Sequence, residues 1–150
     1  MVVLYEDNHI IVVNKAAGEV VQGDETGDVT LLDIVAKYLK EKYNKPGNVF
    51  VGLPHRLDRP TTGIVVLAKT SKALVRLNSL FQNRDGVKKT YWAVVDKRPP
   101  KFTDTLTHYL LKKEDQNRSY AYDKKQKGAK LASLTYRHVA SIDNYHLLEI

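Results

Sequence analysis

The sequence contains no cysteine, and no apolar run in its 150 residues approaches the roughly 20 residues that a membrane-spanning helix needs. The lack of cysteine excludes disulfides, thiolate-bound zinc and catalysis by a cysteine nucleophile. A carboxylate, histidine, tyrosine or lysine must therefore carry any chemistry. The N-terminal residues also lack the basic segment, long apolar stretch and cleavage site of a secretory signal. Together these absences predict a soluble, cytoplasmic protein with no membrane partner.

Sequence motifs for nucleotide cofactors and metal ions are missing as well. Neither G-x-x-x-x-G-K-[ST] nor G-x-G-x-x-G occurs, so no nucleotide cofactor is indicated. Four histidines lack metal-ligand spacing and are interpreted as surface or hydrogen-bonded strand residues: His9, His108, His138 and His146. The spacing of Asp24, Asp28 and Asp58 does not indicate a two-metal nuclease. We therefore expect no cofactor and no metal.

Positive charge is in excess along the chain. Lys and Arg number 24 against 17 Asp and Glu, which gives a net charge of +7 and a pI near 9.5. Polyanions, and nucleic acids above all, are the leading partner class, with a basic surface that serves only solubility as the alternative. Lys and Arg are dense in residues 112–130, where Tyr120 and Tyr122 are interleaved. We interpret such a segment as a solvated, mobile loop, and a segment that clamps an RNA backbone or stacks a base is the alternative.

Hydrophobic periodicity predicts a chain of mixed α and β structure in one domain, residues 1–150. Strands are expected at 2–5, 9–15, 64–68, 89–95, 102–111, 131–139 and 145–150. A helix is expected at 31–43, where Thr30 and Asp33 resemble a capping box, and a second helix after Thr70 or Ser71. The continuous apolar run 64–68 is typical of a strand that is buried on both faces.

One carboxylate, Asp58, lies in the basic stretch His55-Arg56-Leu57-Asp58-Arg59, shortly before the strand expected at 64–68. Arginines within a few ångströms favour the ionised form of a carboxyl group and lower its pKa by about 1 to 3 units. An ionised Asp58 is suited to attack carbon or to stabilise a cationic sugar. The alternative is a loop salt bridge between Asp58 and either Arg56 or Arg59.

The stretch His55-Arg56-Leu57-Asp58, followed by Thr61-Thr62-Gly63 and the strand to Lys69, resembles the signature motif of the RluA family of pseudouridine synthases. Residues 5–15 with Gly18, residues 89–95 and residues 128–150 resemble further segments of that family, in the same order. The resemblance thus covers nearly the whole chain. The chain departs from the usual family residues at Ala16, Gln22, Thr62 and Trp92, and none of these changes removes a reactive group.

The resemblance implies the pseudouridine synthase fold, an α+β architecture with a mixed, largely antiparallel sheet and flanking helices. It also implies an isomerase that acts on large-subunit ribosomal RNA or transfer RNA, with Asp58 as the catalytic residue. The target uridine is flipped out of the RNA, its bond from C1′ to N1 is broken, and the rotated base is rejoined through C5. Asp58 adds to C1′, adds to C6 or promotes formation of a glycal. A non-catalytic RNA-binding protein on the same scaffold is the alternative function.

Substrate contacts are expected from five residues: His55, Arg56, Arg59, Lys15 and Tyr91. The resemblance implies that Arg56 fills the space left by the flipped base or holds Asp58, and a phosphate contact is the alternative. Tyr91 is expected to pack on the flipped uracil and to help remove the C5 proton. From its sequence context alone, Tyr91 is more typical of a core aromatic of a strand.

The last residues, 147–150, lie within an expected strand, which predicts that the chain is a fragment. Family members continue into a segment with Thr-Gly-Arg and Gln-Ile-Arg, whose basic residue pairs with the catalytic Asp. We therefore expect this chain by itself to be weakly active or inactive. The sequence contains no S4-type RNA-binding module, and we expect a monomer.

Overall fold

The structure is a computed structural model, and it describes residues 1–23, 27–83, 86–116 and 118–150. The chain folds into two compact units, Met1–Lys88 and Lys89–Ile150. The sequence predicts a single domain over residues 1–150, and that the two units together make up one domain stays a prediction.

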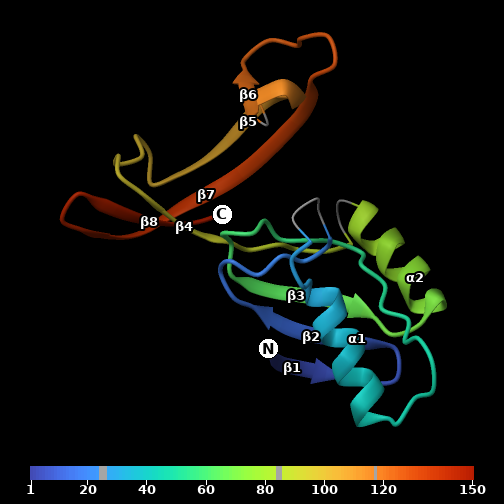
Figure 1. Cartoon of the computed structure of the whole chain (residues 1–150). Coiled ribbons are helices and arrows are strands. Elements are labelled where there is room, and N and C mark those ends of the chain that lie inside the picture. Colours follow the sequence, from blue (N-terminus) through green and yellow to red (C-terminus); the bar gives the residue numbers. More distant parts are fainter. Residues whose placement is uncertain (24–26, 84–85, 117) are drawn as a thin grey trace. The chain divides into compact units, whose positions relative to one another are not determined.

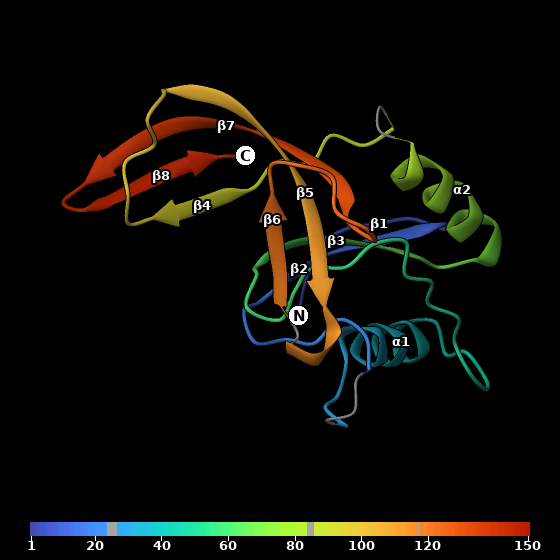
Figure 2. The ribbon, with the colours of Figure 1, turned by 90° about the horizontal axis from the view of Figure 1, so that it is seen from above.

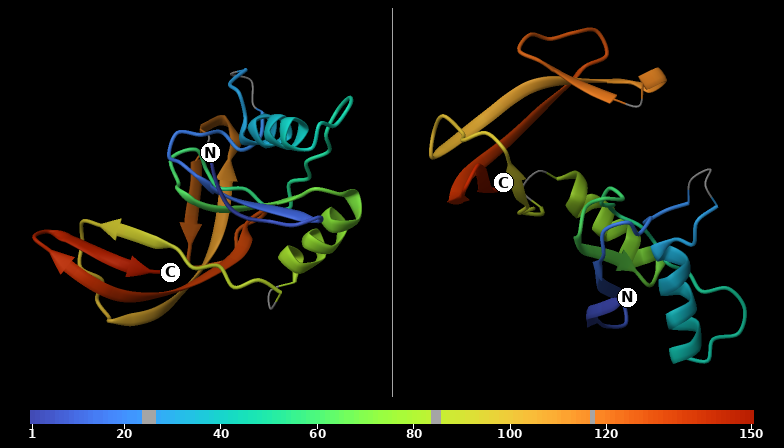
Figure 3. Two further views of the ribbon diagram at one scale, coloured as in Figure 1. Left: turned by 90° about the horizontal axis from the view of Figure 1, so that it is seen from below. Right: turned by 60° about the vertical axis from the view of Figure 1, so that its left-hand side comes forward.

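The first unit combines an antiparallel sheet with helices. Its strands are β1 (Val2–Glu6), β2 (Ile10–Lys15) and β3 (Gly63–Ala68), in the order β1-β2-β3. Its helices are α1 (Leu31–Lys42) and α2 (Ser71–Gln82), and α1 lies along one face of the sheet (Figure 1, Figure 2). β1 carries the N-terminus at the edge of the sheet (Figure 3). The central strand is therefore β2, and it pairs with both neighbours.

The core of the first unit lies between α1 and the face of the sheet that α1 covers. Every second residue of the paired strands is fully buried there: Ile11 and Val13 in β2, and Val65 and Leu67 in β3. Leu31, Val35 and Leu39 of α1 are fully buried at helical spacing against them. The period of two in the strands and of 3.6 in the helix predicted this arrangement. Each such aliphatic side chain contributes about 1.5–3 kcal/mol through burial.

Both helices begin at the residues that the sequence predicts. The Thr30 hydroxyl accepts a hydrogen bond from the Asp33 backbone N–H, and the Asp33 carboxylate accepts one from the Thr30 backbone N–H. This reciprocal pair confirms the predicted capping box. The Thr70 hydroxyl accepts from the Ala73 backbone N–H in the same way and caps α2.

The prediction that the strand at 64–68 is buried on both faces is wrong. Ile64 is 59% exposed, whereas Val65 and Leu67 are fully buried. The strand belongs to an antiparallel sheet, and its inward residues alternate with outward ones. The continuous apolar sequence therefore did not indicate that residues of this strand alternate between buried and exposed positions.

The second unit is an antiparallel sheet in the order β4-β8-β7-β5-β6. Its strands are β4 (Trp92–Val95), β5 (Thr103–Lys113), β6 (Arg118–Tyr122), β7 (Lys130–Ile142) and β8 (Tyr145–Glu149). A short 3-10 helix, Glu114–Gln116, links β5 to β6, and β5 and β7 form a long curved pair (Figure 2). The sequence predicted β4, β5, β7 and β8, with β4 shorter than expected. It did not predict β6, which lies in the segment interpreted as a loop.

The predicted α+β class is confirmed, with one refinement. All strand pairs in the two sheets are antiparallel, so the sheets are not mixed. Parallel pairing occurs within the described ranges as an isolated bridge between Val20 and Thr30. None of the helices in the described part of the chain is long and apolar enough to cross a bilayer.

Candidate functional site

Residues 55–59 lead from the core of the first unit toward β3. Leu57 is 9% exposed and belongs to the core cluster, whereas Arg56 and Asp58 on either side of it are exposed. Successive side chains of an extended segment point to opposite sides. Burial of Leu57 therefore anchors the segment and turns the Asp58 carboxylate toward solvent.

Lys15 is fully buried at the end of β2, directly beside this segment. Its Nζ donates to the carbonyl oxygens of Ala16 at 3.1 Å, Asp58 at 3.1 Å, Arg59 at 3.0 Å and Thr61 at 2.7 Å. An ammonium group has three hydrogens, so these four acceptors use all of them. This corrects the prediction that Lys15 contacts the substrate. A buried ammonium requires such partners, and Lys15 instead holds the loop that bears Asp58.

Backbone hydrogen bonds fix the same loop from two further directions. The Thr61 N–H donates to the Asp58 carbonyl at 3.0 Å, and the Gly18 N–H donates to the Arg59 carbonyl at 2.8 Å. Gly63, which lies opposite Lys15 in the β2–β3 register, has a φ of 134°, a conformation that favours glycine. The main chain at Asp58 is thus tied to β2 and to the turn that follows it.

The Asp58 carboxylate makes no ion pair with its arginine neighbours. Across the described residues of Met1–Lys88, no Lys or Arg nitrogen lies within 4.0 Å of its oxygens. Arg59 instead pairs with Asp28, with 3.0 Å between Nη1 and Oδ2. This corrects both the expected pairing of Asp58 with a close arginine and the alternative of a loop salt bridge. The carboxylate is left open to a ligand.

His55 is half-buried and contacts both β3 and α2. Its Nε2 accepts a hydrogen bond from the Val66 backbone N–H at 3.0 Å, and its ring stacks on Phe81 with centroids 4.4 Å apart. A ring nitrogen that accepts carries no proton, so the ring proton lies on Nδ1. His55 is thereby part of the frame that orders residues 55–57. The substrate contact predicted for it stays a prediction.

Tyr91 belongs to the second unit. Its backbone N–H and carbonyl pair with those of Ile150, both at 2.8 Å, and this pairing extends the β4–β8 ladder. Its side chain is 40% exposed, so the alternative that Tyr91 is a buried core aromatic is wrong. Its contact with the target base stays a prediction, as do the substrate contacts of Arg56 and Arg59, whose side chains are exposed.

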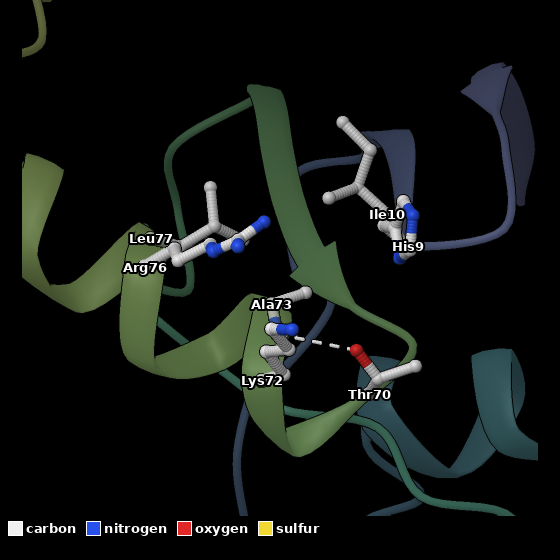
Figure 4. A pocket seen from close by; sticks show the side chains of 7 residues that line it. All are labelled: His9, Ile10, Thr70, Lys72, Ala73, Arg76 and Leu77. Atoms are coloured by element: carbon white, nitrogen blue, oxygen red, sulfur yellow. Dashed lines mark hydrogen bonds between the residues drawn. The ribbon is translucent and has the colours of Figure 1, made fainter.

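A surface pocket of about 520 Å³ lies at the opposite end of β2 and β3 (Figure 4). Its lining residues come from the start of β2 and from α2 with its cap: His9, Ile10, Thr70, Lys72, Ala73, Arg76 and Leu77. At about 3.4 Å per residue, the length of β2 places this pocket about 20 Å from the Lys15 end. The pocket is therefore not part of the site around Asp58. Among the residues with defined positions, no cluster of His, Asp and Glu is placed to hold a metal ion.

Comparison with known protein families and sequences gives consistent matches. The family model described as RNA pseudouridylate synthase matches residues 9–150. Ribosomal large subunit pseudouridine synthase C of Buchnera aphidicola subsp. Acyrthosiphon pisum is 32% identical over 116 residues, which cover 77% of this chain and 35% of that protein. Ribosomal large subunit pseudouridine synthase D of Yersinia pestis is 41% identical over 93 residues, covering 61% of this chain and 27% of that protein.

Solved structures agree with the sequence matches. Human RNA Pseudouridylate Synthase Domain Containing 4 matches with a TM-score of 0.76 and 26% identity, covering 99% of this chain and 57% of that one. The chain spans between 27 and 45% of the length of the curated relatives compared with it. The family model covers nearly the whole chain, which confirms the resemblance in the sequence motifs. The chain therefore belongs to the RNA pseudouridylate synthase family.

Proposed function

We propose that the protein to which this chain belongs isomerises uridines in RNA to pseudouridine, with Asp58 as its catalytic residue. One observation carries the proposal. In a chain of the RNA pseudouridylate synthase family, an exposed carboxylate without an ion-pair partner in its unit stands on a main chain that the buried Lys15 holds. A reactive group needs this combination, because its backbone must be fixed while its side chain stays open to the substrate.

The reaction rearranges bonds without a redox change. The bond from C1′ to N1 breaks, the uracil rotates, a bond forms from C1′ to C5, the C5 proton leaves, and N1 ends protonated. An ionised Asp58 starts this by adding to C1′ or to C6, or by drawing a proton from the sugar to form a glycal. The target nucleotide must leave its stack, because the atoms that react are inaccessible inside it.

The exposed arginines beside Asp58 suit a negatively charged nucleic acid. Arg56 and Arg59 lie on either side of it in sequence, and both side chains reach solvent. Guanidinium groups bind phosphate through paired hydrogen bonds. We assign phosphate binding to Arg59. We propose that Arg56 fills the space that the flipped base leaves. Tyr91 is assigned to the face of the flipped uracil and to removal of the C5 proton.

Large-subunit ribosomal RNA is the substrate class we favour over transfer RNA. Curated relatives from Buchnera aphidicola, Rickettsia prowazekii and Yersinia pestis are named ribosomal large subunit pseudouridine synthases. Whole proteins of that kind are longer than this chain, so the RNA class is a proposal for the natural-length protein. A cytoplasmic location and a monomeric state stay predictions.

The test uses the natural-length protein and RNA labelled with tritium at C5 of uridine. Large-subunit ribosomal RNA, small-subunit ribosomal RNA and transfer RNA are assayed separately. We expect tritium release from the large-subunit RNA, and release from transfer RNA alone would overturn the substrate class. RNA binding without release from any of the three would instead establish the non-catalytic RNA-binding protein.

A further inference from the structure

The sheet formed by β5, β6 and β7 has two chemically different faces. Residues directly opposite each other on neighbouring strands share a face. On one face Leu106 lies opposite Leu134, and Leu110 lies opposite Ala121. The three leucines are 38%, 41% and 40% exposed. We name this the leucine face.

The other face gathers aromatic rings. Tyr109 lies opposite Tyr122 on one side and Leu131 on the other, and Leu111 lies opposite Tyr120 in the next row. We name this the tyrosine face. All three tyrosines are half-buried. Three tyrosine rings therefore share this face with Leu111 and Leu131, whereas Tyr136, which lies opposite Asp104, is buried on the leucine face.

Cations adjoin the rings at the tip of the same face. Lys113 lies opposite Arg118 in the row beyond Tyr120. The Lys113 Nζ is 5.3 Å from the centroid of the Tyr120 ring, and the Arg118 Cζ is 5.6 Å from it. Both groups lie within the range of cation–π attraction. The tip thus presents positive charge and an aromatic ring together.

Hydroxyl groups continue the tyrosine face toward its other end. Thr105 bonds to Thr135 with 2.8 Å between their oxygens, and Thr107 bonds to Ser133 with 3.3 Å. All four residues are exposed. Within β5, β6 and β7, no Asp or Glu lies on this face. Asp104 is the one acidic residue of these strands, and it lies on the leucine face because it is separated from Leu106 by two positions along β5. The face is polar, aromatic and positive, with no carboxylate of these strands to repel an anion.

Net charge points to the same kind of partner. Residues 89–150 contain twelve Lys and Arg against seven Asp and Glu, whereas the whole chain has a net charge of +7. Most of the excess charge therefore belongs to the second unit. Single-stranded nucleic acids are bound by aromatic side chains that stack on bases and by cations that contact the backbone.

We propose that the tyrosine face binds a single-stranded segment of RNA, with its tyrosine rings stacking on bases and Lys113 and Arg118 contacting phosphates. The choice of RNA as the polyanion rests on the proposed function, but the surface does not depend on Asp58. A single strand fits better than a duplex, because bases in an A-form duplex are not available for stacking. A protein partner would instead be expected on the leucine face.

The first test compares Lys113→Gln with Lys112→Gln. These neighbours carry the same charge on opposite faces, and Lys112 pairs with Glu114 at 2.8 Å. Binding of a short, fluorescently labelled single-stranded RNA is measured by anisotropy over a range of salt concentrations. Loss of one phosphate contact lowers the slope of log K against log salt by about 0.7. We expect that change for Lys113→Gln only, and equal changes for both variants would overturn the proposal.

The second test separates the rings from the hydroxyls. Tyr122→Leu removes an aromatic ring, whereas Tyr122→Phe keeps the ring and removes only the hydroxyl. We expect Tyr122→Leu to bind the RNA about ten-fold more weakly and Tyr122→Phe to bind it like the unmodified protein. Tyr122→Leu is compared only if its circular dichroism spectrum is native, and otherwise the lysine pair decides. Leucine and phenylalanine variants of equal affinity would overturn stacking.

Failure of this surface and failure of the proposed function can be told apart. Asp58→Ala should bind the same RNA as tightly as the unmodified protein while releasing no tritium. Suppose that the tyrosine-face variants lose RNA binding and that the unmodified protein releases no tritium. That result would overturn the catalytic proposal alone. If the unmodified protein releases tritium and the tyrosine-face variants bind RNA as before, the RNA-binding surface alone would be overturned.

Discussion

The Nζ of Lys15 lies 3.1 Å from the carbonyl oxygen of Asp58, so a fully buried side chain of β2 holds the main chain beneath an exposed carboxylate. The same ammonium reaches the carbonyls of Arg59 and Thr61. Lys15 is a positioning residue, because it acts on the site through the backbone of Asp58. This one hydrogen bond links the buried charge of Lys15 to the position of the loop that bears Asp58.

Replacement of Lys15 by methionine keeps most of the buried volume and removes the three donors. The carbonyls of Asp58, Arg59 and Thr61 would lose the donor that Nζ supplies, at a cost of about 2–4 kcal/mol in the free energy of unfolding. Urea denaturation measures this loss. Lys72→Met is the control, because Lys72 is exposed on α2 and its loss should cost less than about 0.5 kcal/mol. Equal stability of the two variants would contradict the role of Lys15.

Replacement of His55 by alanine tests whether this residue frames the site or contacts the substrate. The variant leaves the Val66 N–H without its acceptor and removes the stack on Phe81, so we expect a loss of about 2 kcal/mol. His9→Ala, at an exposed position of the same unit, should have little effect on stability. If His55 only frames the site, the RNA affinity of the folded His55→Ala protein should be unchanged. A large loss of affinity at native stability would instead establish the substrate contact.

Periodicity and capping predicted the first unit well, because its elements are local. The stripe of Leu31, Val35 and Leu39, and the Thr30–Asp33 capping box, depend on spacing within a single helix. The exposure of Ile64 could not be read from the sequence, because its apolar character matches that of its buried neighbours. Which face of a strand is covered depends on distant elements.

The sequence predicted the site only in part, because contacts between residues that are distant in the chain build it as well. A signal for Lys15 was present, since it has the same parity in β2 as the buried Ile11 and Val13, and a lysine at that parity must find buried partners. Three of its four acceptors lie more than 40 positions away in the sequence and were not predictable from spacing. Strand β6 was missed because its arginine, its tyrosines and the lysines that follow it in residues 124–130 also suit a solvated loop.

A partly buried ionic cluster at Glu6 joins β1 to α1 and to the end of β3. The Glu6 carboxylate, 7% exposed, accepts hydrogen bonds from four groups: Lys42 at 2.8 Å, Lys69 at 2.7 Å, Tyr43 at 2.6 Å and Tyr38 at 3.1 Å. Burial raises the pKa of Glu6, but these hydrogen bonds outweigh burial and lower the pKa to about 2. The ionised carboxylate therefore stabilises the fold.

The stability that Glu6 contributes should depend on pH in a defined direction. A depressed folded-state pKa means that the contribution is complete above the ordinary value of 4.5 and is lost as pH falls toward 2. The shift corresponds to about 3 kcal/mol, and solvent screening at Lys42, which is 43% exposed, reduces this to about 2 kcal/mol. Glu6→Gln should be less stable than the unmodified protein by that amount at pH 7.

Urea unfolding at several pH values checks this dependence. The difference between Glu6→Gln and the unmodified protein should shrink steadily below pH 4.5. Glu41→Gln is the control, since Glu41 is 69% exposed and its nitrogen partner on Lys37 is 4.0 Å away. Its effect should stay below about 0.5 kcal/mol throughout. A pH-independent difference for Glu6→Gln would contradict the ionic cluster.

Replacement of Tyr91 by phenylalanine tests its proposed part in proton removal. The ring and its 40% exposed position are kept, so RNA affinity should stay the same. The rate of tritium release should fall about 100-fold or more, because a general base is lost. Tyr91→Leu should lower RNA affinity as well, through loss of the stacked ring. Unchanged release from the phenylalanine variant would restrict Tyr91 to a packing role.

The most direct test of the central claim is the rate of tritium release from C5-labelled uridine by natural-length Asp58→Asn. Asparagine has nearly the shape of aspartate but no charge. Because Asp58 is exposed, stability should change by less than about 0.5 kcal/mol. We predict release at least about 1,000-fold slower than that of the unmodified protein, while the Glu41→Gln control stays fully active. Release at the unmodified rate by a folded Asp58→Asn protein would contradict the assignment of Asp58 as the catalytic residue.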